Sequence, residues 1–394
     1  MDVIQTLSSP EMEPITCVDM HTCGEPTRIV IKGYPNLSGT LLEQRAQAKA
    51  EYDHVRRRLM LEPRGHFDMY GAILRSDTEF TRTGHADIGV LFLTNDGYST
   101  MCGHATIALG RFLVDTHDLD VFPNRQGLRF EPESKTVRLR LHAPCGVLSV
   151  TVPATDDGSR SDASRPVSLT SVDCFATGLG VKIPLPPNAL LPSGGTVVAD
   201  FSYGGAFYCL VSVRQLDFLQ RGLNKFDMDA ANQFTKLLKK TVNENAELSY
   251  LFRHPKETDL SFLYSVILVD DTLGQPLPGS QGAETGLCFF SDQQVDRSPT
   301  GSGVSARLAS AYAHGKLRIG DKQTYHSLVS LRRSDRAAFA GMVVEEVESE
   351  TAAKYPCVKT RVEGFASYTG YHTFILERDD LIGNDGFTFK ALAE

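Results

Sequence analysis

The chain has 394 residues, enough for two to three domains of ordinary size, and its 41% hydrophobic and 22% charged residues exclude a disordered or fibrous protein. Its formal net charge of −8 predicts no attraction to nucleic acid or to an anionic membrane. The eight cysteines are dispersed and form no C-x-x-C pair, so a zinc or iron–sulfur framework is not expected. With neither a secretory leader nor a long apolar segment in sight, we expect a reduced, cytoplasmic protein.

Apolar or alternating runs predict strands along the whole chain. In chain order these are Arg28–Ile31, Gly89–Leu93, Val137–Leu141, Gly146–Val152, Ala206–Val211 and Phe262–Val269. Apolar residues at spacings of three and four predict two amphipathic helices, Leu41–Leu61 and Met228–Val242. Arg56, Arg57 and Arg58 lie among acidic residues in the first helix and predict a solvated face. Many strands with few long helices favour an α/β or α+β protein.

Two polar, turn-rich segments interrupt this pattern. Ala154–Asp162 follows a predicted strand and is the best candidate for an interdomain connection. A second long loop, Asp271–Gly286, is rich in Gly, Pro and Gln. We therefore expect the domain boundary near the first of these segments.

Two short segments far apart in the chain resemble each other. Cys102-Gly103-His104-Ala105-Thr106-Ile107-Ala108 aligns with Thr300-Gly301-Ser302-Gly303-Val304-Ser305-Ala306. At the same distance before each lies a Phe in an apolar strand, Phe92 or Phe290, and helical patterns follow at 105–114 and 304–317. Two strand–loop–helix units of this kind predict two homologous halves.

These two segments have the residues of an anion cradle. The N-terminus of a helix has N–H groups without intrahelical partners and a partial positive charge, so it binds carboxylates. A cysteine placed there is expected to have a lowered pKa, although a buried, inert Cys102 is the alternative. His104 stands two residues from Cys102 and does not face it on a helix. His21, His66 and His85 stay open as its partner.

The second segment also fits a dinucleotide fingerprint, because Gly301–Ala306 reads G-x-G-x-x-A. That fingerprint has to follow a strand directly. Here Asp296-Arg297-Ser298-Pro299 intervene, and proline does not sit in a central strand. We therefore expect no nicotinamide cofactor.

Several motifs together resemble the proline racemase family. They are Asp19–Arg28, Met101–His104, Gly204–Tyr208 and Asp296–Gly303, with a similar closing stretch from Gly364 to Phe387. The resemblance covers Ile15–Phe387 and implies the diaminopimelate epimerase-like fold, an α/β (α+β) architecture. Two pseudo-symmetric lobes each wrap a curved sheet around a central helix, with the site between them. It implies a first lobe of residues 1–160, to which 367–394 return, and a second lobe of residues 161–366.

One residue decides which reaction the resemblance implies. Racemases and epimerases of the family carry a second cysteine where this chain has Thr300, because racemisation needs an acid–base group on each face of Cα. A threonine hydroxyl is a far weaker acid than a thiol. Members with a Cys-then-Thr pair dehydrate trans-3-hydroxy-L-proline, so the resemblance implies a lyase that forms Δ1-pyrroline-2-carboxylate. The alternatives are a proline or hydroxyproline racemase or epimerase, and a non-catalytic binder of imino acids.

The resemblance also implies roles for particular residues. Cys102 removes the α-proton and Thr300 contacts the substrate. The substrate-binding residues are Gly103, His104, Gly301 and Ser302 for the carboxylate, Asp296 for the ring ammonium, and Phe290 for the ring pocket. The donor that protonates the departing hydroxide stays open among His104, Thr300 and a bound water.

The resemblance implies no cofactor, metal, nucleic acid or membrane partner, and we expect a homodimer. One position departs from the family pattern: Ala105 stands where a glycine is usual. The extra methyl group is tolerated if φ is negative there.

Overall fold

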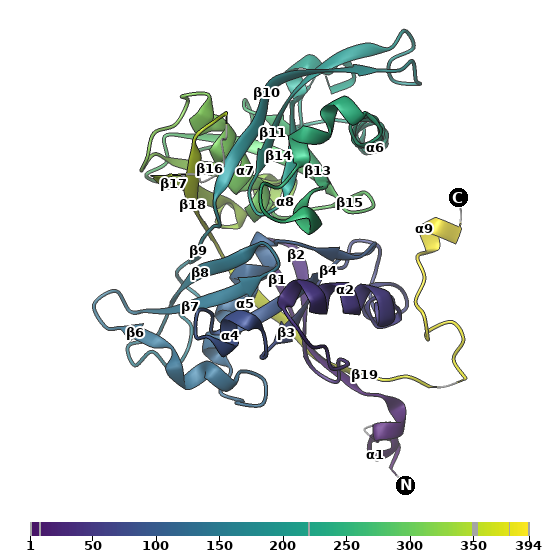
Figure 1. The fold of residues 1–394 in the computed structure, drawn as a ribbon, viewed down its shortest axis with the longest axis vertical. Helices are drawn as coiled ribbons and strands as arrows, with labels where there is room; N and C mark the ends of the chain where they lie inside the picture. The colour runs from purple at the N-terminus through teal and green to yellow at the C-terminus, as the bar shows by residue number, and fades with distance from the viewer. Residues whose placement is uncertain (1, 8, 220, 349–353, 378, 393–394) are drawn as a thin grey trace. The chain divides into compact units, whose positions relative to one another are not determined.

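The computed structural model describes residues 2–7, 9–219, 221–348, 354–377 and 379–392. Its contacts divide the chain into two compact units. The first unit comprises Met1–Thr100, His104–Val167 and Phe365–Glu394, and the second comprises Met101–Gly103 and Ser168–Gly364. Each unit is a mixed α/β body built around one buried helix (Figure 1), which confirms the expected fold class.

In the first unit, strands pair in the order β19–β1–β2–β3–β4–β7–β8. The strands are β1 (Ile15–Thr22), β2 (Glu25–Lys32), β3 (Gly71–Arg75), β4 (Ile88–Leu93), β5 (Tyr98–Ser99), β6 (Arg129–Glu131), β7 (Thr136–Ala143), β8 (Gly146–Pro153) and β19 (Ala366–Phe374). The helices are α1 (Val3–Leu7), α2 (Leu41–Glu51), α3 (Asp53–Met60), α4 (Glu79–Arg82), α5 (Gly103–Asp115) and α9 (Phe389–Leu392), with 3-10 turns at Pro10–Met12 and Pro123–Gly127. The central helix is α5, which packs so closely on β8 that a Cβ at Gly110 would lie 2.7 Å from Val150.

In the second unit, the strands close into a ring in the order β10–β11–β12–β13–β14–β16–β17–β18–β10. They are β9 (Val167–Thr170), β10 (Cys174–Leu185), β11 (Gly195–Tyr203), β12 (Phe207–Ser212), β13 (Leu263–Asp270), β14 (Gly282–Phe290), β15 (Gln294–Val295), β16 (Lys322–His326), β17 (Phe339–Val347) and β18 (Cys357–Gly364). The helices are α6 (Met228–Glu244), α7 (Gly301–Ala313) and α8 (Leu328–Arg333). Short 3-10 turns occur at Val213–Gln215, Asp217–Leu219, Ala246–Phe252, Thr258–Leu260 and Asp335–Ala337. The ring surrounds α7, whose first ten residues, Gly301–Ser310, are buried.

Strands β12 and β13 and the second half of β14 are buried on both faces, which explains why they read as apolar runs without clean alternation. Side chains alternate between the two faces. Cys209, Val266 and Phe289 belong to the core cluster that includes Phe234 of α6. Their neighbours Tyr208, Ile267 and Cys288 lie on the other face, where Ile267 approaches Gly303 of α7. These neighbours therefore form the inner wall around the central helix.

Both units repeat one order of pairings, so the two pseudo-symmetric lobes expected from the sequence are confirmed. An antiparallel pair leads by a helical crossover to a parallel neighbour, β2 to β3 through α2 and α3, and β12 to β13 through α6. A hairpin then precedes each central helix, with Phe92 paired to Ser99 and Phe290 paired to Gln294. The two phenylalanines that align in sequence thus occupy equivalent strand positions.

The structure corrects two expectations in the helical hairpin before β3. The expected single helix Leu41–Leu61 is two helices, because Tyr52 leaves the helical conformation (φ −124°, ψ 19°) and ends α2. The expected solvated arginine face is also wrong. Arg56 and Arg58 are 3% and 5% exposed. Arg56 donates hydrogen bonds to the Asp53 carboxylate and to the carbonyls of Thr94 and Asn95. It therefore links helix α3 to the turn after β4.

Smaller differences concern boundaries. Helix α7 ends at Ala313, four residues before the expected Leu317, because Gly315 follows with φ +70°. Strand β14 starts at Gly282, inside the expected loop Asp271–Gly286. The chain passes from the first unit to the second between Val167 and Ser168, and the segment Ala154–Asp162 lies within the first unit.

Candidate active site

The two aligned segments meet in the second unit at a pair of glycines. Gly103 is the first residue of α5 and Gly301 the first of α7. A Cβ built on Gly103 would lie 2.5 Å from Gly301 Cα, and one built on Gly301 would lie 2.6 Å from Gly103 Cα. The two backbones are therefore in direct contact, and neither position has room for a side chain. The residues that precede these glycines, Cys102 and Thr300, are 4% and 6% exposed.

Thr300 has a strained backbone. Its φ of +65° and ψ of 89° lie in the left-handed region, where a β-branched residue is an outlier. Such a conformation costs on the order of 1–3 kcal/mol and persists only where the surroundings hold it. Here the Thr300 N–H donates to Ser298 Oγ at 3.1 Å, and the Thr300 carbonyl accepts from Val304 N–H at 2.6 Å.

The Thr300 side chain does not cap α7, although a helix cap is the usual role of a threonine at this position. Its hydroxyl instead hydrogen-bonds with the Asp296 carboxyl and the Cys288 thiol. The strained backbone thus turns the hydroxyl away from the helix end and toward two titratable groups. The helix N–H groups of Gly301 and Ser302 are left to other acceptors.

Asp296 is a buried carboxyl group, 6% exposed. Burial raises its pKa from 3.8 to about 6, and hydrogen bonds from Ser298 and Thr300 oppose that rise. One of these is the Ser298 N–H, which donates to Oδ1 at 2.7 Å. At neutral pH the group is therefore mainly a carboxylate, stabilised by hydrogen bonds from Ser298 and Thr300 and by the nearby positive charge of Arg297. A buried carboxyl with so perturbed a pKa is typical of functional sites.

Two residues of the inner wall were missed by sequence reasoning. Tyr208, fully buried on β12, shares a 2.6 Å hydrogen bond with Ser302 Oγ, and Cys102 and Asp296 both influence its pKa electrostatically. Cys288 on β14 lies 2.9 Å from Ser265 Oγ, and burial raises the pKa of its thiol to about 12. Tyr208 belongs to the motif Gly204–Tyr208, but its contact with Ser302 becomes visible only from its position inside the strand ring.

Phe290 lies at the end of β14 and is 2% exposed. The centre of its ring lies 5.8 Å from the centre of the Tyr264 ring. The Tyr264 ring in turn meets the Tyr208 ring edge-on, with 6.0 Å between their centres. Phe262 extends the group at 6.4 Å from Tyr264. Phe290 therefore belongs to an aromatic wall that begins at Tyr208, the tyrosine bonded to the start of α7.

Gly204 explains why the motif Gly204–Tyr208 starts with glycine. A Cβ at this position would lie 2.2 Å from Ser302 O and 2.6 Å from Ala306 N, both in the first turns of α7. The loop before β12 thus packs backbone to backbone on the helix that begins at Gly301. This contact fixes the position of the N–H groups of that first turn.

His104 is described with the first unit and is 3% exposed. Burial lowers the pKa of its imidazole to about 3, despite a hydrogen bond to the Pro26 carbonyl. The ring meets Tyr70 edge-on at 4.6 Å, and the His104 carbonyl accepts from Thr22 Oγ1 at 2.8 Å. The imidazole is therefore neutral, and its contacts anchor the first turn of α5 to the β1–β2 hairpin.

The other histidine candidates have local partners in the first unit. His21 Nδ1 accepts from the Gly24 N–H at 3.2 Å, within the β1–β2 turn, and His85 Nδ1 lies 2.9 Å from Thr83 Oγ1. Ala105 lies inside α5 and is fully buried, so its φ is negative and its methyl group is accommodated.

Of the residues singled out from the sequence, the second unit contains Cys102, Gly103, Phe290, Asp296, Thr300, Gly301 and Ser302, and the first unit contains His104. No group of three His, Cys, Asp or Glu side chains suited to a metal ion occurs among the residues that the structure describes. Within the same residues, no helix combines the length and apolar character needed to cross a membrane. What the second unit assembles is a thiol, a hydroxyl, a buried carboxylate and the N–H groups of a helix start.

A family model described as proline racemase matches residues 17–388. The trans-3-hydroxy-L-proline dehydratase of Homo sapiens is 38% identical over 387 residues, which cover 97% of this chain and 96% of that protein. The protein of the same name from Burkholderia cenocepacia is 34% identical over 93% of this chain and 96% of its own length.

Two solved structures share the fold. A hydroxyproline epimerase from Agrobacterium vitis, with bound trans-4-hydroxy-L-proline, has a TM-score of 0.73 and 23% identity, covering 95% of each chain. A probable proline racemase from Agrobacterium radiobacter, with bound carbonate, has a TM-score of 0.75 and 24% identity, covering 96% of this chain and 97% of that one.

Proposed function

Because the chain belongs to the proline racemase family, we propose that it is a hydro-lyase that converts trans-3-hydroxy-L-proline to Δ1-pyrroline-2-carboxylate. The observation that carries the proposal is Thr300, which stands beside the Gly103–Gly301 contact as the counterpart of Cys102 and has a hydroxyl in place of a thiol. Names of relatives that match nearly the whole chain support the substrate.

In the proposed reaction, the Cys102 thiolate removes the α-proton of the bound imino acid. The N–H groups of Gly103, Gly301 and Ser302 bind the carboxylate and stabilise the negative charge that develops on it. The Asp296 carboxylate binds the ring ammonium, a role that suits a buried group that is ionised at neutral pH. Phe290 and its aromatic neighbours form an apolar surface for the ring.

The electron pair left on Cα then forms a double bond to Cβ as the C–O bond breaks. The departing hydroxide takes up a proton and leaves as water, and the resulting enamine tautomerises to the cyclic imine. His104 is neutral at working pH, which argues against an imidazolium as the donor. The donors that remain in the proposal are the Thr300 hydroxyl and a bound water.

A racemase or epimerase would need a second thiol of ordinary acidity opposite Cys102. Cys288 hydrogen-bonds with Thr300, but its pKa of about 12 makes it a poor proton donor and no thiolate at neutral pH. This argues against racemisation as the main activity. We also propose that the enzyme is cytoplasmic and forms a homodimer. Light scattering on the purified protein tests the homodimer.

The decisive experiment incubates the purified protein separately with trans-3-hydroxy-L-proline, trans-4-hydroxy-L-proline and L-proline in D₂O. We expect Δ1-pyrroline-2-carboxylate from the first compound and no inverted stereocentre in the other two. The Thr300→Cys variant should lose dehydration and gain some epimerisation. Inversion by the wild type with the 3-hydroxylated substrate left intact would refute the proposal, and binding without α-proton exchange would identify a non-catalytic binder.

A further inference from the structure

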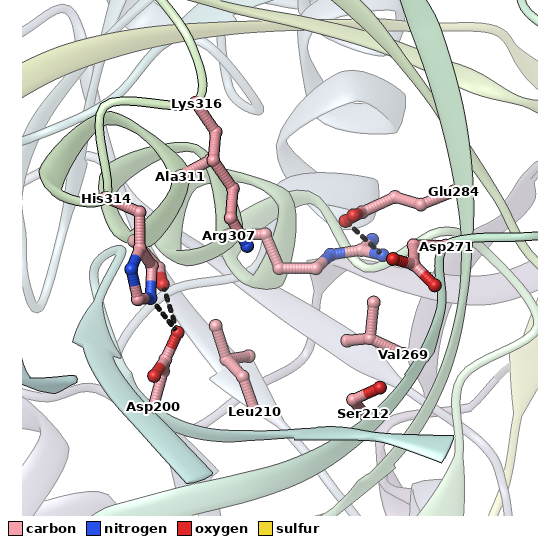
Figure 2. A pocket seen from close by; sticks show the side chains of 11 residues that line it. Asp200, Leu210, Ser212, Val269, Asp271, Glu284, Arg307, Ala311, His314 and Lys316 are labelled. Atoms are coloured by element: carbon pink, nitrogen blue, oxygen red, sulfur yellow. Dashed lines mark hydrogen bonds and ion pairs between the residues drawn. The ribbon is translucent and has the colours of Figure 1, made fainter. Parts of the chain in front are cut away.

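The second unit contains a cavity that none of the candidate active-site residues lines (Figure 2). Its volume is about 170 Å³, and its walls come from β11, β12, β13, β14 and the second half of α7. A cavity of about 150 Å³ in another protein holds a benzene molecule. This one therefore has room for a ligand of roughly six to eight non-hydrogen atoms.

Arg307 of α7 is a buried cation at this cavity, with a side chain only 3% exposed. Its Nε and Nη1 atoms make no hydrogen bond to any residue that the structure describes, although Glu284 Oε1 lies 3.3 Å from Nη1 as an ion pair. Leaving buried donors of a charged group unsatisfied is costly. The Nε N–H is thus available to an acceptor inside the cavity, and Nη1 has a second N–H beyond the one that faces Glu284.

The guanidinium group is fixed in place by the surrounding fold. Its Cζ lies 4.6 Å from the centre of the Tyr325 ring, and Nη2 donates to the Pro299 carbonyl at 2.8 Å. Gly286 makes room for it, since a Cβ there would lie 2.7 Å from Nη1. Because Pro299 directly precedes Thr300, the same side chain touches both the cavity and the loop of the candidate active site.

The charges around the cavity are mixed. Asp200 is engaged by His314 Nε2 at 2.7 Å and by Ser310 Oγ at 2.8 Å. Glu284 and Asp271 supply negative charge near the guanidinium, although Asp271 also pairs with Arg214 at 2.7 Å, and Lys316 supplies a second permanent positive charge on the cavity wall (Figure 2). A dianion would face three carboxylates, and a simple cation would face Arg307 and Lys316. A molecule that carries one charge of each sign satisfies both sets.

We propose that this cavity binds a small zwitterion of the size of an amino or imino acid. Its carboxylate contacts Arg307 Nε and Nη1 together with Lys316, and its ammonium faces Glu284 and Asp271. Ligand binding in the cavity shifts the position of Thr300 through the hydrogen bond that Arg307 Nη2 donates to the carbonyl of Pro299, the residue before it. The site is separate from the catalytic residues and goes beyond the proposed dehydration.

Calorimetry tests the binding directly. L-proline and glycine are titrated into the full-length protein after its active site has been saturated with pyrrole-2-carboxylate, with acetate and methylammonium as probes of single charge. We expect one remaining site per chain for at least one zwitterion, and much weaker binding of both single-charge probes. No remaining site for either zwitterion, or equal binding of acetate, would overturn the proposal.

Two matched pairs of variants locate the site. Lys316→Ala removes one charge-assisted contact and should weaken binding at least about tenfold. Ala311→Leu fills the cavity without a change in charge and should abolish binding. The controls are Lys236→Ala, an exposed lysine of α6, and Ala313→Leu, a residue of α7 outside the cavity. Unchanged affinity in Lys316→Ala and Ala311→Leu would place the ligand elsewhere. Equal losses of affinity in the two control variants would do the same.

Steady-state kinetics tests the link to the loop. L-proline should inhibit dehydration with a noncompetitive component in the wild type, and Ala311→Leu should leave only the competitive part. A purely competitive pattern in the wild type would rule out transmission. This readout depends on the proposed dehydration, whereas calorimetry does not, so failure of the function and failure of the site are distinguishable.

Discussion

At the scale of single residues, the candidate site combines groups held in unfavourable states. Thr300 has a backbone that its β-branched side chain disfavours, and Asp296 carries a carboxylate that burial disfavours. Both are fixed by Ser298, which donates its N–H to Asp296 and accepts from the Thr300 N–H. One serine therefore orients two residues that the proposed reaction uses.

Asp296→Asn should stabilise the protein while it impairs activity. The folded-state pKa of about 6 lies above the usual 3.8, so this group favours the folded state fully below pH 3.8, and that advantage is lost as pH rises through 6. At pH 7 the buried charge costs about 3 kcal/mol, an upper bound for the gain in the amide variant. Urea unfolding at pH 7 and at pH 4 measures it, and the gain should be much smaller at the lower pH.

The same group sets the acid limb of activity. As pH falls through about 6, Asp296 takes up a proton and no longer attracts the ring ammonium. We expect kcat/KM for trans-3-hydroxy-L-proline to fall about tenfold per pH unit below that value, with the effect mainly in KM. A pH–rate profile that stays flat between pH 5 and 7 would show that Asp296 does not bind the substrate's charge.

Gly103→Ala should disrupt the site where the two aligned segments meet. The new methyl group would lie 2.5 Å from Gly301 Cα, and backbone on both sides leaves no flexible group to yield. We expect a loss of about 3 kcal/mol or more in unfolding free energy, together with loss of turnover. Gly127→Ala, where nothing lies within 4 Å of the added Cβ, is the control and should unfold like the wild type.

At the scale of elements, the closure of the strand ring depends on a buried hydroxyl cluster. Thr360 of β18 donates its N–H to Ser171 Oγ at 3.0 Å, and its own hydroxyl contacts Ser171 Oγ at 2.9 Å and Ser305 Oγ of α7 at 2.8 Å. The Ser171 N–H donates in turn to the Thr360 carbonyl at 2.9 Å. The cluster ties the segment before β10 to both β18 and the central helix.

Thr360→Val should destabilise the protein by about 1–3 kcal/mol, because it leaves the hydroxyls of Ser171 and Ser305 without their buried partner. The double variant Ser171→Ala with Thr360→Val should lose less than the sum of the two single variants, since they share one contact. Chemical denaturation of the three proteins measures this coupling. If the losses of unfolding free energy in the two single variants add up to the loss in the double variant, the hydroxyl cluster has no cooperative contribution to stability.

Local patterns predicted β2, β4, β7, β8, β12, β13 and helix α6 to within a few residues, because each of these elements shows its own apolar periodicity. The break at Tyr52 has no proline or glycine to announce it, and the burial of Arg56 depends on carbonyls of the β4–β5 turn far along the chain. The pairing of β18 with β10 is equally invisible, since nothing local indicates which distant strand completes a ring.

At the scale of the whole molecule, seven of the eight cysteines are buried and Cys145 is partly exposed. Burial raises the pKa of Cys17, Cys174 and Cys288 to about 12 and that of Cys357 to about 11, and it raises that of Cys209 further. Cys145 is the most exposed of the eight. These thiols of raised pKa are therefore inert in the folded protein.

Brief alkylation at pH 7.5 should label Cys145 and Cys102, and pyrrole-2-carboxylate should slow the second but not the first. The five thiols of raised pKa should react only as fast as the protein unfolds, which mass spectrometry in increasing urea can follow. Rapid labelling of Cys288 in the native state would contradict the contacts described for Thr300.

For the candidate site, motifs in the sequence singled out candidate residues but could not supply their surroundings. The Cys102 and Thr300 segments align, and the structure brings their glycines into contact. Tyr208 and Cys288 were missed because their role comes from alternation on strands that face α7, and both faces of those strands are apolar enough to hide the period. Arg307 was missed because a single charged residue in a helix of mostly small residues gives no signal of a cavity.

The hydrogen bonds between Ser171 and Thr360 also mean that the long stretch from Ser168 to Gly364 begins and ends at the same place. Because the ends adjoin, we expect that this stretch can be excised as a cassette, or joined head to tail and reopened at a surface loop such as Asp271–Gln281. The excised cassette would keep Asp296, Thr300 and the Arg307 cavity but leave Cys102 behind. Protein engineers could thus separate recognition from proton abstraction by cutting the chain rather than by mutating it.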